Sequence, residues 1–475
     1  MQITRFTRPS QKTVLIATLM MGSFLVLLNQ MLLVTAVPPI MAAFDIPFST
    51  AQWLTTGFFL VNGIMIPVSA FLINKFTSRT LYLTGMMIFI AGTILAAVAP
   101  LYSVLLAGRI LQGIAAGIMM PLTQVILLTQ FPLEQRGKAM GYFGLVIGLA
   151  PAIGPPLAGY IVGIWPWRSL FLIVLPLVLA NLLLAYLSMK NVTHQTNPKV
   201  DIPSIVLSTL GFGGLLYGFS VAGVRGWADP LVLLSVFGGL ALVLVFTKRQ
   251  LKLPQPILEM TVFKNRYFLM SSLIGVIVFT SMVSANNILP VLMQDMLGYT
   301  PFESGLALLP GALLMGATMP VAGILFDKFG IRTLTFAGLG LILATSIMLS
   351  FLTKETTFTY LAIVYTFRLL GTGLTMMPLT TFAMNALHDS KIPHGTAMNN
   401  TMRQIGSSLF TAVMVTVMTG VALNLSAGTP SLVDEIAGVN VAFIFSALMA
   451  AAGLLMTFFL REQDYSRQQD RTEDV

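Results

Sequence analysis

Long apolar stretches alternate with short polar segments along the whole chain, and this pattern predicts membrane-spanning helices. Each stretch holds about 18 residues or more, which is enough for a helix to cross a hydrocarbon core about 30 Å thick. A transmembrane β-barrel would instead show segments of about 10 residues with alternating polarity. The sequence therefore predicts an all-α membrane protein with 14 transmembrane helices, which begin near residues 13, 50, 80, 101, 139, 167, 203, 230, 267, 302, 333, 358, 395 and 438.

The composition agrees with this prediction and excludes several kinds of chemistry. Of the 475 residues, 56% are hydrophobic and only 9% are charged, whereas soluble domains carry about 25% charged residues. The absence of cysteine excludes disulfides and thiolate metal sites. The sequence contains no Walker A, HExxH or GxSxG motif and no soluble domain large enough for catalysis. We therefore expect no enzyme activity, no cofactor, no metal and no nucleic-acid partner.

The positions of the basic residues predict the orientation in the membrane. Lys and Arg accumulate in short cytoplasmic loops. With the N-terminus inside, 20 of the 26 Lys and Arg residues fall in cytoplasmic segments; the other six lie in outer loops (Arg168, Arg225, Lys354) or within spans (Arg109, Arg368, Arg403). This predicts a multi-pass protein of a plasma membrane, most simply a bacterial one, with both termini in the cytoplasm.

The chain also repeats itself, which predicts two equivalent halves. "PVSAFLINKFTSRTLYLTG" (67–85) matches "PVAGILFDKFGIRTLTFAG" (320–338) at 9 of 19 positions, and "RILQGIAAGIMMPLT" is echoed by "RLLGTGLTMMPLT". Matched spans cross in the same direction, as in transporters whose two bundles rock around a midplane site. We expect a cytoplasmic N-terminus (1–12), an N-terminal six-helix bundle (13–190), a linker with two extra spans (191–266), a C-terminal six-helix bundle (267–460) and a cytoplasmic tail (461–475).

Four motifs resemble the major facilitator superfamily, and in particular its 14-span drug:proton antiporter branch of QacA/EmrB/LmrB-like multidrug exporters. They are the loop motif "GILFDKFGIRT", the fourth-span motif "GRILQGIAAG", the antiporter motif "GLVIGLAPAIGPPLAGYI" (144–161) and "NNTMRQIGSS". The resemblance covers almost the whole chain. It implies the major facilitator fold, with two six-helix bundles in parallel pseudo-twofold repeat, and export of amphiphilic molecules by proton antiport through alternating access.

The antiporter motif favours both close packing against a neighbouring helix and bending of its own helix. Small residues let helix backbones approach, and prolines bend a membrane helix where neighbours satisfy the freed carbonyls. The resemblance implies that this span seals the pathway between the bundles, although a merely kinked packing helix would carry the same residues. The motif residues are Gly144, Gly148, Pro151, Gly154, Pro155 and Gly159.

The residues expected to couple or gate transport include two arginines within spans, Arg109 and Arg403, whose charge is unfavourable in a membrane. An arginine at a helix centre costs at least about 2.5 kcal/mol on insertion scales, so Arg109 is either a coupling residue, as the resemblance implies, or a structural one that binds helix carbonyls. No acidic residue is predicted at mid-membrane, which favours an anionic or zwitterionic substrate. The first repeat also departs from the family at Asn74, where an Asp is usual. The coupling and gating candidates are Arg109, Gln112, Asp295, Asp327, Arg332 and Arg403.

A cavity between the bundles is expected to bind the substrate. Methionine is abundant, at 29 residues, and its flexible thioether suits varied apolar shapes, although many of these side chains will pack or face lipid. The expected partners are amphiphilic substrates, protons and membrane lipid. A dedicated exporter of an endogenous lipid, fatty acid or metabolite with weak or no proton coupling is the alternative. The candidate cavity residues are Asn29, Gln30, Trp53, Phe58, Asn62, Met119, Met120, Asn286, Asn287, Met376 and Met377.

Overall fold

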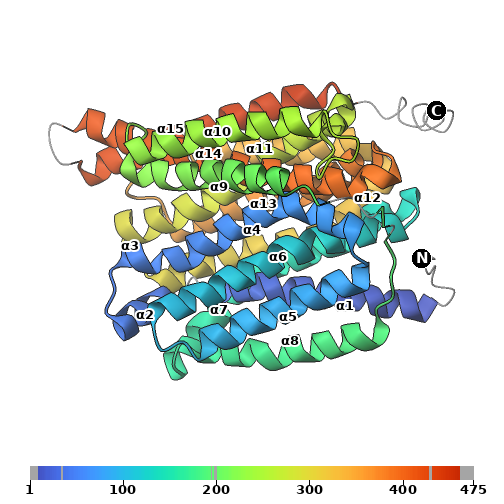
Figure 1. Ribbon diagram of the computed structural model, residues 1–475. Coiled ribbons are helices and arrows are strands. Elements are labelled where there is room, and N and C mark those ends of the chain that lie inside the picture. The colour runs from blue at the N-terminus through green and yellow to red at the C-terminus, as the bar shows by residue number, and fades with distance from the viewer. Residues whose placement is uncertain (1–8, 34–35, 194, 197–199, 427–429, 461–475) are drawn as a thin grey trace.

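In the computed structural model the chain is a bundle of long helices that run along a common direction (Figure 1). The structure describes residues 9–33, 36–193, 195–196, 200–426 and 430–460. The predicted tail (461–475) and most of the predicted N-terminal segment (1–12) lie outside the described residues.

Thirteen helices in the described part of the chain are long and apolar enough to cross a membrane, which confirms the all-α prediction. Short helices join some of them: α2 (Val37–Phe44), α3 (Phe48–Ala51), η2 (Leu133–Gln135), η3 (Met260–Lys264), η4 (Leu292–Met296) and η5 (Asp389–Lys391). The long helices are α1 (Pro9–Leu32), α4 (Trp53–Lys75), α5 (Ser78–Ala97), α6 (Tyr102–Gln130), α7 (Arg136–Ile164), α8 (Ser169–Ser188), α9 (Ile202–Arg225), α10 (Pro230–Gln250), α11 (Arg266–Val291), α12 (Pro301–Met348), α13 (Phe358–Asn385), α14 (Ile392–Leu425) and α15 (Leu432–Thr457).

One of these helices holds two of the predicted spans. α12 has 48 residues, and at a rise of 1.5 Å per residue a straight helix of this length would measure about 72 Å, far more than one crossing needs. Its backbone leaves the helical conformation at Gly330, where φ is 75° and ψ is 173°. A positive φ favours glycine because it has no Cβ. The chain therefore turns at Gly330, and α12 supplies the two crossings predicted near residues 302 and 333.

Polar side chains mark where several helices begin. Thr357 accepts a hydrogen bond from the backbone N–H of Tyr360 at the start of α13. Asn265 accepts from the N–H groups of Tyr267 and Phe268 at the start of α11. Such caps satisfy N–H groups that have no partner in the first turn of a helix.

The two halves meet through equivalent pairs of helices. α7 of the first half packs along α12 of the second, and α4 of the first packs along α14 of the second. The two extra helices lie at the side of this arrangement: α9 packs against both α4 and α14, and α10 packs against α9 (Figure 1). The predicted two-bundle fold with two additional helices is therefore confirmed.

Candidate functional site

The contact between α7 and α12 depends on glycines of the antiporter motif. A Cβ atom added at Gly148 would lie 2.4 Å from the Cα atom of Gly316, and one added at Gly144 would lie 2.6 Å from the sulfur of Met319. These distances are far shorter than ordinary van der Waals contacts of 3.4–4 Å. The two helix backbones therefore approach as closely as they do only because these positions carry no side chain.

The contact continues toward the start of α7 but not toward its end. A Cβ atom at Gly141 or Gly137 would also meet α12, at 2.8 Å from the Met319 carbonyl oxygen and 2.7 Å from the Gly323 carbonyl oxygen. Beyond Pro151, a Cβ atom at Gly154 would instead meet Met31 of α1, in the same half. The halves are thus closed against each other along one half of α7.

Glycine at position 159 has no such packing role. A Cβ atom added there would find no other heavy atom within 4 Å. Pro151 and Pro155 lie inside α7, which continues through both of them. Of the predicted motif, Gly144 and Gly148 therefore contact the other half, while the remaining residues shape α7 or pack within its own half.

Polar side chains bridge the halves at the same closed end. Arg136 donates to Asp389 at 2.8 Å, and the Asp327 carboxylate accepts from the backbone N–H of Lys138. Two further hydrogen bonds connect the halves: Asn74 Nδ2 to His394 Nε2 at 3.0 Å, and Asn400 Nδ2 to Gln124 Oε1 at 2.9 Å. Asp327, a candidate for coupling or gating, therefore lies at the contact between the two halves.

Arg109 is fully buried on α6 and connects this helix to two others, α1 and α4. Its Nε donates to the Leu54 carbonyl of α4 at 3.2 Å, and its Nη1 donates to Asn29 of α1 at 3.0 Å and to Gln112 at 2.8 Å. Its guanidinium carbon lies 4.6 Å from the centroid of the Phe58 ring, within the range of a cation–π interaction. Nη2 has no hydrogen-bond partner. Four predicted residues, Arg109, Gln112, Asn29 and Phe58, thus form one buried cluster with a free N–H group.

The repeat partner of Arg109 has a different environment. Arg368 is fully buried on α13, and the hydroxyls of Ser281, Ser346 and Ser446 each accept a hydrogen bond of 2.7 Å from its guanidinium. Nη2 and Nε also donate to the Ser281 carbonyl. The sequence around Arg368 did not predict these partners, because the three serines lie on three other helices, α11, α12 and α15.

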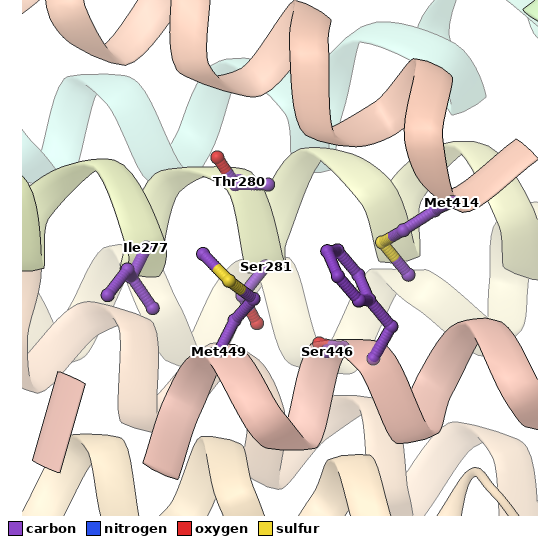
Figure 2. A pocket seen from close by; sticks show the side chains of 7 residues that line it. Ile277, Thr280, Ser281, Met414, Ser446 and Met449 are labelled. Atoms are coloured by element: carbon purple, nitrogen blue, oxygen red, sulfur yellow. The ribbon is translucent and has the colours of Figure 1, made fainter. Parts of the chain in front are cut away.

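A small cavity lies beside these serines. It measures about 10 Å³, and Ser281 and Ser446 lie on its wall together with Thr280 and Met414 (Figure 2). This volume is close to the minimum for a single water molecule. The Arg368 site is therefore well packed, and its guanidinium is satisfied by protein groups alone.

Arg403 occupies a third buried position, on α14. Its Nη2 donates to Thr380 Oγ1 at 2.7 Å and to the Met376 carbonyl at 3.4 Å, both on α13. A Cβ atom added at Gly275 of α11 would lie 3.1 Å from the same nitrogen. Within the part of the chain that the structure describes, the three ion pairs involve neither Arg109 nor Arg368 nor Arg403.

Other predicted residues lie away from these clusters. Asp295 is exposed in η4 at the end of α11, and Arg332 is exposed beside the rings of Phe336 and Phe458. Asn286 accepts a hydrogen bond from the Tyr365 hydroxyl, whereas Asn287 is exposed. The structure does not bring Asp295 or Arg332 to the contact between the halves.

The predicted cavity residues divide into packing and partly accessible positions. A Cβ atom at Gly85 would lie 3.0 Å from Met119, and one at Gly144 would lie 2.7 Å from Met377. Met119 therefore packs against α5, and Met377 packs at the contact with α7. Trp53 stacks on Tyr217 of α9 with ring centroids 5.9 Å apart. Gln30 and Met376 are buried, while Asn62 and Met120 are half-buried.

Sequence reasoning did not predict the polar bridges of the closed end. Arg136 and His394 occupy equivalent positions in "RGKAM" and "HGTAM", the segments that open α7 and α14. The match between these two segments was the feature of the sequence that could have indicated Arg136 and His394. Their partners, Asp389 in η5 and Asn74 in the last turn of α4, belong to the opposite half and could be identified only from the packing.

Comparison with known proteins gives consistent results. The family model described as "Major Facilitator Superfamily" matches residues 19–411. The chain is 48% identical over 463 residues to the "Uncharacterized MFS-type transporter YcnB" of Bacillus subtilis, covering 97% of this chain and 98% of that protein. It is 37% identical to the "Lincomycin resistance protein LmrB" of Listeria monocytogenes, covering 94% and 96%.

A solved structure agrees with the fold. The human organic anion transporter MFSD10 (TETRAN) has a TM-score of 0.67 to this chain at 13% sequence identity, covering 95% of this chain and all of that one. At this identity the likeness concerns the fold alone.

Proposed function

The chain belongs to the Major Facilitator Superfamily, and we propose that it exports amphiphilic small molecules by alternating access. It is a membrane transporter of the multidrug exporter branch. The observation that carries the proposal is the contact between α7 and α12, which closes one half of α7 through Gly144 and Gly148 and leaves position 159 free of neighbours. A contact that seals one end of a pathway and can part as two bundles rock is what alternating access requires.

The closed end is the cytoplasmic one in the orientation that we propose from the basic residues. In this orientation both termini lie in the cytoplasm of a plasma membrane, and the halves extend over 13–190 and 267–460. The described conformation then corresponds to the stage after substrate has left the cytoplasmic side. The bridges Arg136–Asp389, Asn74–His394 and Gln124–Asn400 hold this stage closed.

We further propose that Arg109 senses the state of the transport cycle. It binds α1, α4 and its own helix at once, so a relative movement of these helices changes the guanidinium environment. Its free Nη2 donor is suited to an acceptor group of the substrate or to a water molecule. Arg368 has no comparable freedom because five hydrogen bonds satisfy it.

The proposed energy source is a proton gradient, which the protein would use by proton antiport. The family resemblance supports it, and Asp295, in η4 directly after α11, is the proposed acidic proton carrier. In the described part of the chain Arg109, Arg368 and Arg403 have no carboxylate partner, which favours the alternative, an exporter of an endogenous lipid, fatty acid or metabolite with weak coupling. Both proposals predict export, and they differ in whether a pH gradient drives it.

Dye efflux from proteoliposomes with a defined pH gradient separates these possibilities. Ethidium and an anionic dye would be measured side by side, with and without nigericin. Efflux that collapses with the gradient supports antiport, and efflux that is indifferent to the gradient refutes it. Loss of efflux in Arg109→Lys, with unchanged thermal unfolding, supports the role of Arg109, whereas unchanged efflux contradicts it. Asp295→Asn tests the proton carrier in the same assay.

A further inference from the structure

A basic hollow lies at the end of α10, away from the contact between the halves. It has a volume of about 260 Å³ and is lined by Lys248, Arg249, Lys252 and Leu253. Lys248 and Lys252 are exposed, and the ion pairs in the described part of the chain involve neither of them. The hollow thus presents two lysine ammonium groups at an end of a membrane helix.

The wall of this hollow is held in place by a polar network. Arg249 donates to the two carboxylate oxygens of Asp201, at 2.9 and 3.1 Å, and to Ser204 at 3.1 Å. The neighbouring Gln250 is buried; it donates to Ser204 at 2.7 Å and accepts from the backbone N–H of Ile257 at 2.8 Å. These bonds tie the start of α9, the end of α10 and the loop after it together.

The network also fixes the charge of the hollow. Arg249 and Asp201 neutralise each other, and the hydrogen bonds from Arg249, together with a weaker one from Ser204, hold the pKa of the Asp201 carboxyl below its ordinary value. Lys248 and Lys252 remain without a carboxylate partner, so the hollow carries about two unneutralised positive charges.

An apolar stripe on α10 leads into the hollow. Phe237, Leu240 and Leu244 are 64%, 45% and 55% exposed, and Lys248 follows one turn after Leu244. Residues three and four apart share a face of a helix. The same face of α10 is therefore apolar along the membrane and basic at its end, which is the pattern of one phospholipid molecule: acyl chain, then phosphate.

We propose that this hollow binds an anionic phospholipid, with the phosphate between Lys248 and Lys252 and an acyl chain along the stripe of Phe237, Leu240 and Leu244. The charges favour an anionic headgroup over a zwitterionic one. The apolar stripe favours a lipid over free phosphate. The bound lipid would hold α10, which packs on α9. Because α9 contacts both α4 and α14, the lipid would thereby stabilise a helix that touches both halves.

The test is thermal unfolding of the purified full-length protein in detergent, with added dioleoyl phosphatidylglycerol, dioleoyl phosphatidylcholine or potassium phosphate. Phosphatidylglycerol is expected to raise Tm in a saturable way, and the effect is expected to weaken with salt. The double variant Lys248→Gln/Lys252→Gln is expected to need about 25-fold more phosphatidylglycerol, since each basic side chain near an anionic lipid contributes about fivefold. Lys190→Gln, at another exposed lysine, is the matched control and keeps the wild-type response.

Three results would overturn the proposal. They are an equal response to phosphatidylcholine, an equal response to potassium phosphate, or an unchanged phosphatidylglycerol response in the double variant. Both lysines are exposed, so the double variant without lipid is expected to unfold at the wild-type temperature. This measurement does not depend on transport, so its outcome is separate from that of the proposed export activity.

Discussion

Replacing Gly148 by alanine is expected to shift the protein toward the conformation in which α7 and α12 are apart. The new Cβ atom would lie 2.4 Å from Gly316 Cα and 2.7 Å from Gly316 N. Both are backbone atoms of a helix, and backbone atoms cannot relieve the overlap by changing rotamer as a flexible side chain can. To regain a contact of 3.4 Å, the two helices must separate by about 1 Å along this direction.

The size of the shift follows from the cost of overpacking. Inserting a methyl group into a well-packed contact costs about 1–3 kcal/mol, and 1.4 kcal/mol corresponds to a factor of ten in an equilibrium. The substitution is therefore expected to favour the opened conformation by about 5- to 140-fold. The cost applies only to the closed conformation, because the contact is absent when the helices part.

Two glycines provide matched controls. A Cβ atom at position 159 of the same helix meets no heavy atom within 4 Å, and one at Gly316 comes no closer than 3.4 Å to Gly148. Gly159→Ala and Gly316→Ala gain the same helix propensity, about 1 kcal/mol, without the overlap. Any difference between them and Gly148→Ala therefore reports on the contact itself.

The absence of cysteine makes the assay direct. Asn400→Cys introduces a single thiol at the closed end, where Asn400 is half-buried against Gln124. Its alkylation rate by a maleimide is measured in the wild-type, Gly148→Ala, Gly159→Ala and Gly316→Ala backgrounds. We expect faster alkylation only with Gly148→Ala. Equal rates in all four backgrounds would refute the argument that this glycine contact closes the pathway.

Three further predictions follow from the buried and charged groups. Arg368→Ala is expected to destabilise the protein by about 3 kcal/mol, since it removes five interhelical hydrogen bonds of about 0.6 kcal/mol each; an unchanged Tm would contradict this. Arg136→Asp and Asp389→Arg are each expected to open the closed end and to restore it when combined, with a coupling energy of about 1 kcal/mol or less because Asp389 is 66% exposed; a double-mutant cycle of alkylation rates measures it. Because the pKa of Asp201 is lowered by Arg249, the pair stabilises the fold above the ordinary Asp pKa and this contribution is lost as pH falls through the lowered value; Asp201→Asn should flatten the acid side of the Tm–pH curve.

Much of the fold could be predicted from the chain because hydrophobicity acts locally. A stretch of apolar residues long enough to span a membrane forms a helix whatever its neighbours are, since backbone groups in lipid must find partners within the helix. The spans near 302 and 333 were predicted separately although the structure joins them in α12, because Gly330 and the charged residues around it interrupt the apolar pattern. The repeat, in turn, predicted which helices are equivalent.

The site was only partly predictable. Arg109 and Gln112 lie one turn apart, so their contact follows from helix geometry. The approach of Asn29, Leu54 and Phe58 to this arginine involves residues at least 51 positions away and required the packing of three helices. The residue type marked Arg109 as costly but did not identify its partners.

The sequence by itself determined that the chain crosses a membrane 14 times, that its halves are equivalent and that three arginines lie inside spans. Tertiary structure decided that Gly148 rather than Gly159 meets the other half, that serines satisfy Arg368, and that one end of the pathway is closed. The physical reason is that burial and helix formation depend on residues close in the chain, whereas a close contact depends on the relative positions of helices that are more than 100 residues apart.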